Sequence, residues 1–258
     1  MLVGAMNNPA RALEEELRRI AAAGFDVADV TLEPPGAWPC DGAALGALLA
    51  ELGLMGVGHT AYYLPIASPF PALRRAAHKE MHEAFDVFAQ AGIDRVNVHP
   101  DPLNRLFAPD ELLARNAEAL AELLDAAAER NLILMLENLG RVLGSVEELR
   151  PLFAVSRDLR FHLDVGHANL GRGLGAPNRT HELLEAFGDR LAHVHVSDNL
   201  GLEDLHLPLG AGNIEWQAIV RTLKDVGWDG AVTLEIFSPD RRHLASSREL
   251  WLEWWAAA

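Results

Sequence analysis

Short apolar runs alternate with longer amphipathic segments along the whole chain. The runs are rich in Val, Ile and Leu and have the length of strands, whereas the longer segments carry Ala, Leu, Glu and Arg at helical spacing. The strands predicted from this pattern cover residues 1–5, 27–33, 54–59, 94–99, 132–137, 159–164, 191–196 and 231–236. The predicted helices cover residues 10–23, 42–52, 72–91, 109–130, 146–155, 180–187, 215–226 and 242–255. The pattern therefore predicts eight strand–helix units in succession.

The ends of several predicted helices carry residues that are typical of helix termini. Gly24, Gly53, Gly92 and Gly227 each follow a helical segment, at the position where a left-handed residue is common. Pro109 stands in the first turn of a predicted helix, where proline is tolerated. These residues support the predicted helix boundaries.

The order of the elements predicts how the strands pair. Strands that alternate with crossover helices pair in parallel through right-handed connections, and eight such units close into a barrel. The chain has 258 residues, close to the roughly 250 that are typical of this fold, and no linker rich in Ser, Gly and Pro divides it. The sequence therefore predicts an α/β protein with a single (β/α)₈ TIM barrel that spans residues 1–258 as one domain.

Composition and charge narrow the range of functions. The net charge of −15 at pH 7 repels phosphate polymers, so we expect a small-molecule substrate rather than a nucleic acid. The chain has one cysteine, Cys40, and it starts without the pattern of a signal peptide. Charged residues, Gly or Pro interrupt every apolar run before the roughly 18 residues that a membrane span needs. We therefore expect a cytoplasmic protein without a membrane role.

Seven predicted strands end in a side chain that can bind a metal ion. These residues are Glu33, His59, His99, Glu137, Asp164, His195 and Glu235. Any one of them alone could equally face solvent or cap the next helix. Together they indicate an active site, because a parallel barrel directs the carboxyl ends of its strands toward one mouth.

A cluster of carboxylates at that mouth requires a positive charge. Carboxylates that converge on one point repel each other, and a divalent cation removes this repulsion. Ligands that mix carboxylate and imidazole suit transition metals better than Ca²⁺. We therefore expect a divalent metal cofactor, Zn²⁺ or Mn²⁺ first, with Co²⁺, Fe²⁺ or Mg²⁺ as alternatives.

The segments around these strand ends form a set of short motifs. They are Gly58-His59-Thr60, Val98-His99-Pro100, Leu136-Glu137-Asn138, Leu163-Asp164-Val165-Gly166-His167, Val194-His195-Val196-Ser197-Asp198, Asp204-Leu205-His206 with Gly210-Ala211-Gly212-Asn213-Ile214, and Leu234-Glu235. Together they resemble the xylose isomerase-like TIM barrels. This superfamily contains sugar and sugar-phosphate isomerases and epimerases as well as the endonuclease-IV-type nucleases that act on abasic DNA. The resemblance extends through nearly the whole chain.

The resemblance implies a metal site and a mechanism. The metal ligands of the family match Glu137, Asp164, His195 and Glu235. In its isomerases and epimerases, the glutamates that match Glu137 and Glu235 lie on either side of the substrate and exchange a proton with it. Removal of a proton beside a carbonyl gives an enediolate, which the cation stabilises. The resemblance also implies that His167 takes part in catalysis by a hydrogen bond to a substrate oxygen.

The nuclease branch uses three metal ions, and its additional ligands match residues that this chain also has. These residues are His59, His99, His167, Asp204 and His206. One to three ions are therefore expected. In the family members that act on sugars, the residues that match His59 and His99 line the substrate pocket instead. The negative charge and the lack of a run that mixes Arg or Lys with aromatic residues favour a sugar substrate over DNA.

We therefore predict a metal-dependent isomerase or epimerase of a small sugar, sugar phosphate or polyol. An endonuclease-IV-like phosphoesterase with three metal ions is the first alternative, and a dehydratase of a keto-inositol or shikimate-type ring is the second. A barrel that only binds a sugar is the third, and it would catalyse no isotope exchange at the substrate carbon.

Residues in and near the loops after the strands are candidates for substrate contacts. Glu33 is predicted either to accept hydrogen bonds from sugar hydroxyls or to remain a solvated or helix-capping carboxylate. Tyr62 is predicted either to form a wall of the pocket or to serve only for packing. Arg141 and Arg172 are candidates for binding a substrate phosphate through their guanidinium groups, with a place on the surface as the alternative.

A step of two positions back along each strand keeps the same face and reaches a polar layer below the mouth. The members of this layer are Thr31, Asn97, His162, His193 and Thr233. They predict either hydrogen bonds that orient the metal ligands or a polar network with only a structural role.

Trp251, Trp254 and Trp255 lie at helical spacing on the last predicted helix. This apolar stripe predicts packing against the barrel wall. An exposed stripe would instead form the interface of a homodimer.

Overall fold

The computed structural model describes residues 1–102, 106–171 and 176–258. Its strands are β1 (Leu2–Met6), β2 (Val27–Thr31), β3 (Met55–His59), β4 (Arg95–Val98), β5 (Ile133–Glu137), β6 (Arg160–Asp164), β7 (Leu191–Val196) and β8 (Ala231–Leu234). Its helices are α1 (Leu13–Ala22), α2 (Gly42–Leu52), α3 (Pro71–Gln90), α4 (Pro109–Ala128), α5 (Val146–Phe153), α6 (Thr180–Phe187), α7 (Trp216–Asp225) and α8 (Arg242–Ala257), with 3₁₀ turns at His167–Asn169 and Gly188–Arg190. Every predicted strand and helix is confirmed, with boundaries that differ by no more than three residues.

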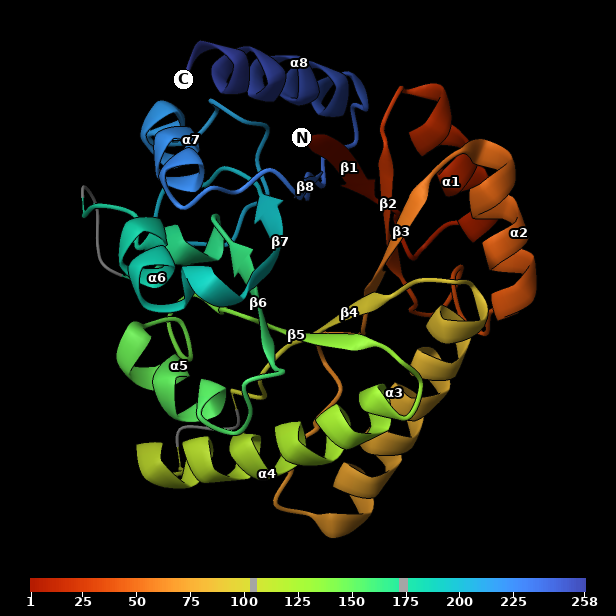
Figure 1. Cartoon of the computed structure of the whole chain (residues 1–258), viewed down its shortest axis with the longest axis vertical. Helices are drawn as coiled ribbons and strands as arrows, with labels where there is room; N and C mark the ends of the chain where they lie inside the picture. Colours follow the sequence, from red (N-terminus) through yellow and green to blue (C-terminus); the bar gives the residue numbers. More distant parts are fainter. Residues whose placement is uncertain (103–105, 172–175) are drawn as a thin grey trace.

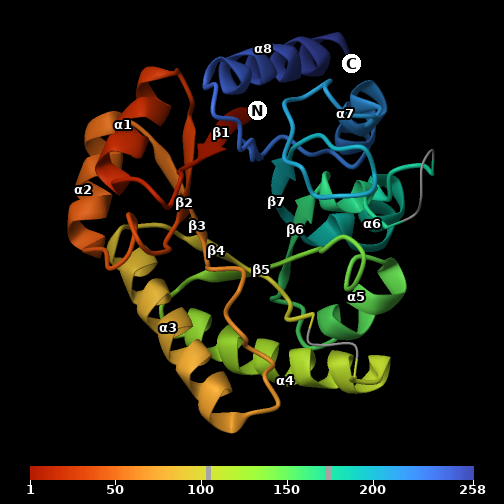
Figure 2. The ribbon, with the colours of Figure 1, turned by 180° about the vertical axis from the view of Figure 1, so that it is seen from behind.

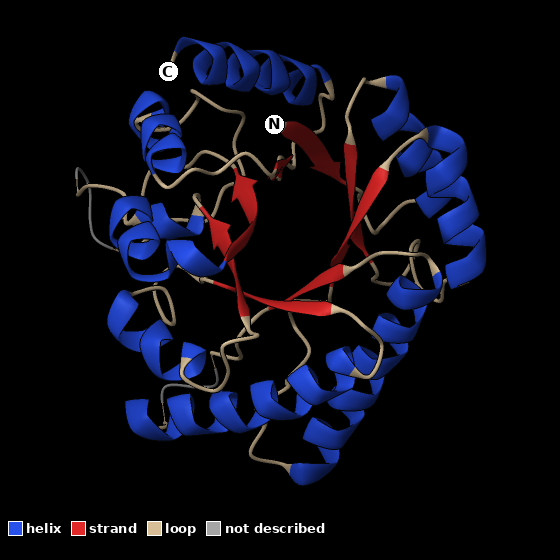
Figure 3. Ribbon diagram, viewed as in Figure 1, coloured by secondary structure: helices blue, strands red, loops and turns tan. Residues whose placement is uncertain are grey.

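The strands pair in parallel in chain order and close into a barrel. β1 pairs with β2 on one side and with β8 on the other, so that Gly4 lies opposite both Val27 and Thr233. The helices form a ring around the strands, which is clear from both sides of the molecule (Figures 1 and 2) and from the inner circle of strands in Figure 3. The predicted (β/α)₈ TIM barrel is thus confirmed.

The helix ends follow the predicted chemistry. Gly24, Gly53, Gly92 and Gly227 have φ values of 77°, 67°, 76° and 73°, in the left-handed region that favours glycine. Pro109 is the first residue of α4. These glycines stop the helices and return the chain to the amino-terminal end of the next strand.

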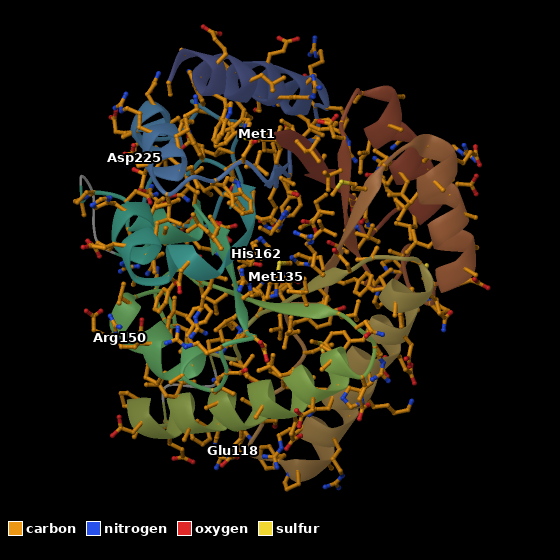
Figure 4. The ribbon with its side chains drawn as sticks, viewed as in Figure 1. Met1, Glu118, Met135, Arg150, His162 and Asp225 are labelled. Carbon is orange, nitrogen blue, oxygen red and sulfur yellow. The ribbon has the colours of Figure 1, made fainter. Side chains whose placement is uncertain are left out.

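The core is divided into two parts. The larger part lies between the barrel and the helices and includes fully buried side chains such as Phe85 of α3 and Leu120 of α4. A small apolar cluster inside the barrel contains Val27, Val57 and Met135. Figure 4 shows Met135 at the centre of the ring. The rest of the barrel interior is mostly polar. Its buried side chains include Asn97, His162 and His193.

The tryptophan stripe of α8 packs against the rest of the protein as predicted. Trp251 is fully buried, and its ring lies 6.1 Å from that of Trp216. Trp254 stacks on Trp216 at 6.2 Å, and Trp255 is partly buried against the core. In the described ranges, no helix combines the length and the apolar character that a membrane span needs.

Candidate active site

Four side chains from the last four strands converge inside the mouth of the barrel. Glu137, Asp164 and His195 lie at or near the carboxyl ends of β5, β6 and β7, and Glu235 directly follows β8. Each offers one atom that lies within 4.8 Å of the atoms offered by the other three, and all four are buried. Nδ1 of His195 lies 3.2 Å from Oε2 of Glu235 and 3.9 Å from Oδ2 of Asp164. The structure therefore brings together the four residues that the sequence predicted as metal ligands.

The charges in this cluster fit a divalent cation. Burial, together with the nearby carboxylates of Glu235 and Glu137, raises the pKa of Asp164 to about 7 against the effect of His167 and His195. Oδ2 of Asp164 is buried and accepts no hydrogen bond from the described part of the chain. Three carboxylates and one imidazole form a donor set that suits Mn²⁺, Zn²⁺ or a related ion.

Glu137 lies among polar partners that favour its charged form. Its Oε2 atom accepts a 2.6 Å hydrogen bond from Asn97 and lies 3.1 Å from Nε2 of His99 and 3.3 Å from Nδ1 of His162. Burial alone would raise the pKa of Glu137, but His99, His162 and His167 lower it well below its ordinary value. Glu137 is therefore an ionised carboxylate, as a general base requires.

Glu235 is ionised for a similar reason. Burial opposes its charge, but His195 and His206 lower the pKa of Glu235 to about 2. Glu235 lines the cavity directly. Glu137 is 1% exposed and contacts the lining residues His99 and His167.

Asp29 of β2 is a site residue that the pattern of strand ends does not predict. Its Oδ2 atom lies 2.8 Å from Nε2 of His195 and 3.2 Å from Nε2 of His193. Asp29 therefore holds Nε2 of His195, so that Nδ1 of the same ring faces Glu235 and Asp164. The signal in the sequence is one acidic residue inside the buried strand Val-Ala-Asp-Val-Thr.

Two further groups of metal-capable side chains adjoin this cluster. His59, His99 and Glu137 form one group within 4.8 Å of one another. Burial, with a contribution from His99, lowers the pKa of His59 to about 4, so its imidazole is neutral and able to bind a metal ion. In the second group, Oδ2 of Asp204 lies 3.1 Å from Nε2 of His167 and 3.0 Å from Nε2 of His206.

Asp198 fixes the loop that carries Asp204 and His206. Its buried carboxylate accepts hydrogen bonds from the amides of Gly210 and Ile214 and from the indole of Trp216. A Cβ atom at Gly212 would lie 2.2 Å from Oδ1 of Asp198, so only glycine fits there. The Gly-Ala-Gly-Asn segment is therefore the local reason that this loop lies over the mouth.

A cavity of about 960 Å³ opens above these residues. Its wall includes Tyr62 and Glu33. Glu33 is only 8% exposed, and burial raises its pKa while His99 and Tyr63 favour its charged form. The loop after β2 thus folds the side chain of Glu33 into the cavity wall, where a substrate contact stays a prediction.

Neither of the two arginines predicted as phosphate ligands is found in the cavity wall among the described residues. Arg141 does not line the cavity, because its guanidinium group donates a hydrogen bond to the carbonyl of Leu202 at the surface. The prediction that Arg141 binds substrate is thus not supported by its position. Arg172 lies outside the described residues.

Comparison with known proteins identifies the family. A family model described as xylose isomerase-like TIM barrel matches residues 17–255. The chain belongs to this family, as the motifs at the strand ends had predicted.

Several relatives of the chain are sugar epimerases. An L-ribulose 3-epimerase from Methylomonas sp. (strain DH-1) is 29% identical over 85% of this chain and 77% of that protein. A ketose 3-epimerase from Arthrobacter globiformis is 26% identical over 95% of this chain and 86% of that protein. The crystal structure of a D-tagatose 3-epimerase-like protein has a TM-score of 0.88 and 27% identity, covering 100% of this chain and 98% of that one.

Proposed function

We propose that this protein is a metal-dependent epimerase that inverts carbon 3 of a ketose. The observation that carries the proposal is the pair Glu137 and Glu235, two ionised carboxylates on different strands that share one cluster with Asp164 and His195. The names of the relatives support carbon 3 as the reacting position.

The chemistry follows from the acidity of the carbon next to a carbonyl. One glutamate removes the proton from carbon 3, and the electron pair of that C–H bond forms an enediolate with the carbonyl at carbon 2. The other glutamate, which first takes up a proton from solvent, delivers that proton to carbon 3 from the opposite face, and this inverts the configuration. A divalent cation held by Glu137, Asp164, His195 and Glu235 would supply the positive charge that stabilises the enediolate. We propose Zn²⁺ or Mn²⁺ as this ion.

Residues around the cluster would orient the sugar. The polar side chains of Glu33, Tyr62, His59 and His99 line the cavity and offer hydrogen bonds to sugar hydroxyls. His167 is held by Asp204 at its Nε2 atom and by the carbonyl of Asn138 at its Nδ1 atom. Asp164, Asp204 and Glu137 raise the pKa of His167 well above its ordinary value against the effect of burial, so its imidazolium can stabilise a developing oxyanion.

The test is conversion of a panel of ketoses by the purified protein loaded with Mn²⁺ or Zn²⁺. The products are separated by chromatography and identified by NMR. The proposal predicts formation of the carbon 3 epimer and its loss in Glu137→Gln and in Glu235→Gln, both with unchanged circular dichroism. Full activity of both variants would contradict the two-glutamate mechanism.

The second candidate is a phosphoesterase of the endonuclease IV type with three metal ions. The observation that favours it is the completeness of the donor set, with His59 and His99 beside Glu137 and with His167 and His206 around Asp204. The net charge of −15 opposes binding of DNA.

Metal stoichiometry distinguishes the two candidates. Elemental analysis of protein purified without added metal or chelator gives the number of ions per chain, and anomalous scattering from crystals places them. One ion at Glu137, Asp164, His195 and Glu235 supports the epimerase. Three ions, with the further ones at His59 and His99 and at Asp204 and His206, support the phosphoesterase, which would then be assayed on abasic DNA.

A further inference from the structure

Two arginines stand out in the wall of the cavity. Arg11 and Arg241 are the only lysine or arginine side chains among the described residues that line it. The other charged groups of the wall, besides histidines, are the carboxylates of Glu33, Asp101, Asp204 and Glu235. A pair of cations in the otherwise acidic pocket of a protein with a net charge of −15 requires an explanation.

The two arginines come from neighbouring loops and are tied to one buried carboxylate. Arg11 precedes α1, and Arg241 directly precedes α8, above the paired strands β1 and β8. Oε2 of Glu16 lies 2.7 Å from Nη2 of Arg241, and Oε1 lies 4.0 Å from Nε of Arg11. Glu16 is 1% exposed and also accepts a hydrogen bond from the amide of Asn8. Glu16 therefore holds Arg241 in a close ion pair and lies within 4.0 Å of Arg11, which places both guanidinium groups at one end of the cavity.

The backbone of Arg11 is fixed by Gly36. The amide of Gly36 donates a 2.8 Å hydrogen bond to the carbonyl of Pro9. A Cβ atom at Gly36 would lie 2.0 Å from the carbonyl oxygen of Arg11, so the two loops are in direct contact. Because the backbone of the loop is held before a ligand arrives, only the side chain of Arg11 has to be ordered when it binds one.

The charges around Glu16 leave a positive excess. Arg19 also donates to Glu16, and its other partner is Glu15. Arg11, Arg19 and Arg241 thus share two carboxylates. The excess charge lies with Arg11 and Arg241 on the cavity side, because Arg19 does not line the cavity. Planar guanidinium groups present paired donors that match a carboxylate or a phosphate.

The arginine pair and the metal-binding cluster belong to one cavity. Glu235 follows β8, and Ile236, Phe237, Ser238 and Pro239 continue the wall from Glu235 toward Arg241. A ligand whose reacting carbon lies beside Glu235 can therefore extend along this segment to the two arginines.

We propose that the substrate is an anionic ketose, with a carboxylate or a phosphate at the end away from the reacting carbon, and that Arg11 and Arg241 bind this group. The inference rests on the proposed epimerase function. The inference adds the charge of the substrate, which the proposed epimerase function leaves open.

The kinetic test compares matched ketoses that are neutral, carry a terminal carboxylate or carry a terminal phosphate. The expected result is a kcat/KM that is about tenfold to a hundredfold higher for one anionic ketose than for the neutral one, since hydrogen bonds to charged groups are strong. Arg11→Gln and Arg241→Gln should each lower this ratio by about tenfold, mainly through KM. Arg241→Lys, which keeps the charge and loses the fork, should lie between wild type and Arg241→Gln.

Arg242→Gln is the matched control. Arg242 is adjacent in sequence, but its side chain is 89% exposed, pairs with Asp240 and does not line the cavity. The ratio should stay at the wild-type value in this variant. A carboxylate preference identifies a sugar acid, and a phosphate preference identifies a sugar phosphate. A wild-type ratio near one, or a ratio that neither Arg11→Gln nor Arg241→Gln changes, would overturn the inference while leaving the epimerase proposal intact.

A binding measurement separates the inference from the proposed reaction. Calorimetry with the unreactive ligands D-glucitol, D-gluconate and D-glucitol 6-phosphate requires no turnover. The inference predicts tighter binding of one anionic ligand than of D-glucitol, with the difference lost in Arg241→Gln and retained in Arg242→Gln. If no ketose is converted but this pattern is found, the anion site stands and the epimerase proposal fails. Equal binding of the three ligands would overturn the anion site.

Discussion

Nε2 of His195 lies 2.8 Å from Oδ2 of Asp29, although the two residues are 166 positions apart in the sequence. Nδ1 of the same ring faces Glu235 at 3.2 Å. This arrangement gives the imidazole one nitrogen for a metal ion and one nitrogen for a carboxylate. Asp29 is thus a positioning residue for the metal-binding cluster.

Asp29→Leu should weaken metal binding by about tenfold to a hundredfold, because His195 then loses the partner that orients its ring. Asp29→Asn keeps an acceptor oxygen and should retain more of the affinity. The measurement is a competition titration with a chromophoric chelator, which reports affinity without turnover. Wild-type affinity in Asp29→Leu would show that Asp29 has only a structural role.

Metal removal should destabilise the protein. At a free metal concentration of about 100 times Kd, the bound ion contributes about 2.7 kcal/mol to the free energy of unfolding. A chelator should remove this contribution, and thermal unfolding measures the loss as a lower Tm.

Asp164→Asn is the informative variant for this measurement. It should abolish the metal-dependent rise in Tm, and it should make the metal-free protein more stable than metal-free wild type. The reason is that it removes one of three buried carboxylates that repel each other. A variant that is less stable than wild type without metal would contradict this electrostatic interpretation.

The stability of the metal-free protein should depend on pH through Glu33. Burial raises the pKa of Glu33 from its ordinary value of 4.5, so the folded state is destabilised where this carboxylate is ionised. Glu33→Gln should therefore increase the free energy of unfolding at pH 7, and the gain should disappear as the pH falls below 4.5. Urea denaturation of both proteins at pH 4 and pH 7 measures it. An equal gain at both pH values would exclude the titration of Glu33 as the cause.

Gly212→Ala should disturb the loop that carries Asp204 and His206. The added Cβ would lie 2.2 Å from Oδ1 of Asp198, and such overpacking costs about 1–3 kcal/mol. Turnover should fall together with stability. Gly188→Ala is the control, since its Cβ would meet no atom closer than 3.6 Å. Equal effects of the two substitutions would argue against a specific role of the Asp198 contacts.

One geometric rule makes it possible to predict from the sequence that the residues at the strand ends form a site. Parallel strands in a closed barrel bring their carboxyl ends to one mouth, so Glu137, Asp164 and His195 are predicted to converge from their positions alone. The same rule, applied two residues deeper, predicts that Asn97 and His162 lie in the barrel interior. The structure shows both beside Glu137, and Figure 4 labels His162 near the centre of the ring.

Contacts that depend on the closure of the barrel cannot be predicted from the sequence by this rule. Asp29 meets His195 only because the closed sheet brings β2 across from β7, and no sequence pattern relates the two strands. Arg11 and Arg241 lie in irregular segments whose path is set by Glu16 and Gly36 rather than by a strand period. Loop side chains such as Arg141 can equally turn outward, as the structure shows.

Solvent isotope exchange at carbon 3 reports directly on the proposed reaction of the two glutamates. The metal-loaded protein is incubated with a ketose substrate in D₂O, and deuterium in the substrate and in the epimer is followed by NMR. Removal of the carbon 3 proton by one glutamate and delivery of a solvent-derived deuteron by the other predict one deuterium at carbon 3 of the epimer, with little in the remaining substrate at early times. Formation of the epimer without deuterium, or unchanged ketose in all tests, would contradict epimerisation by these two glutamates.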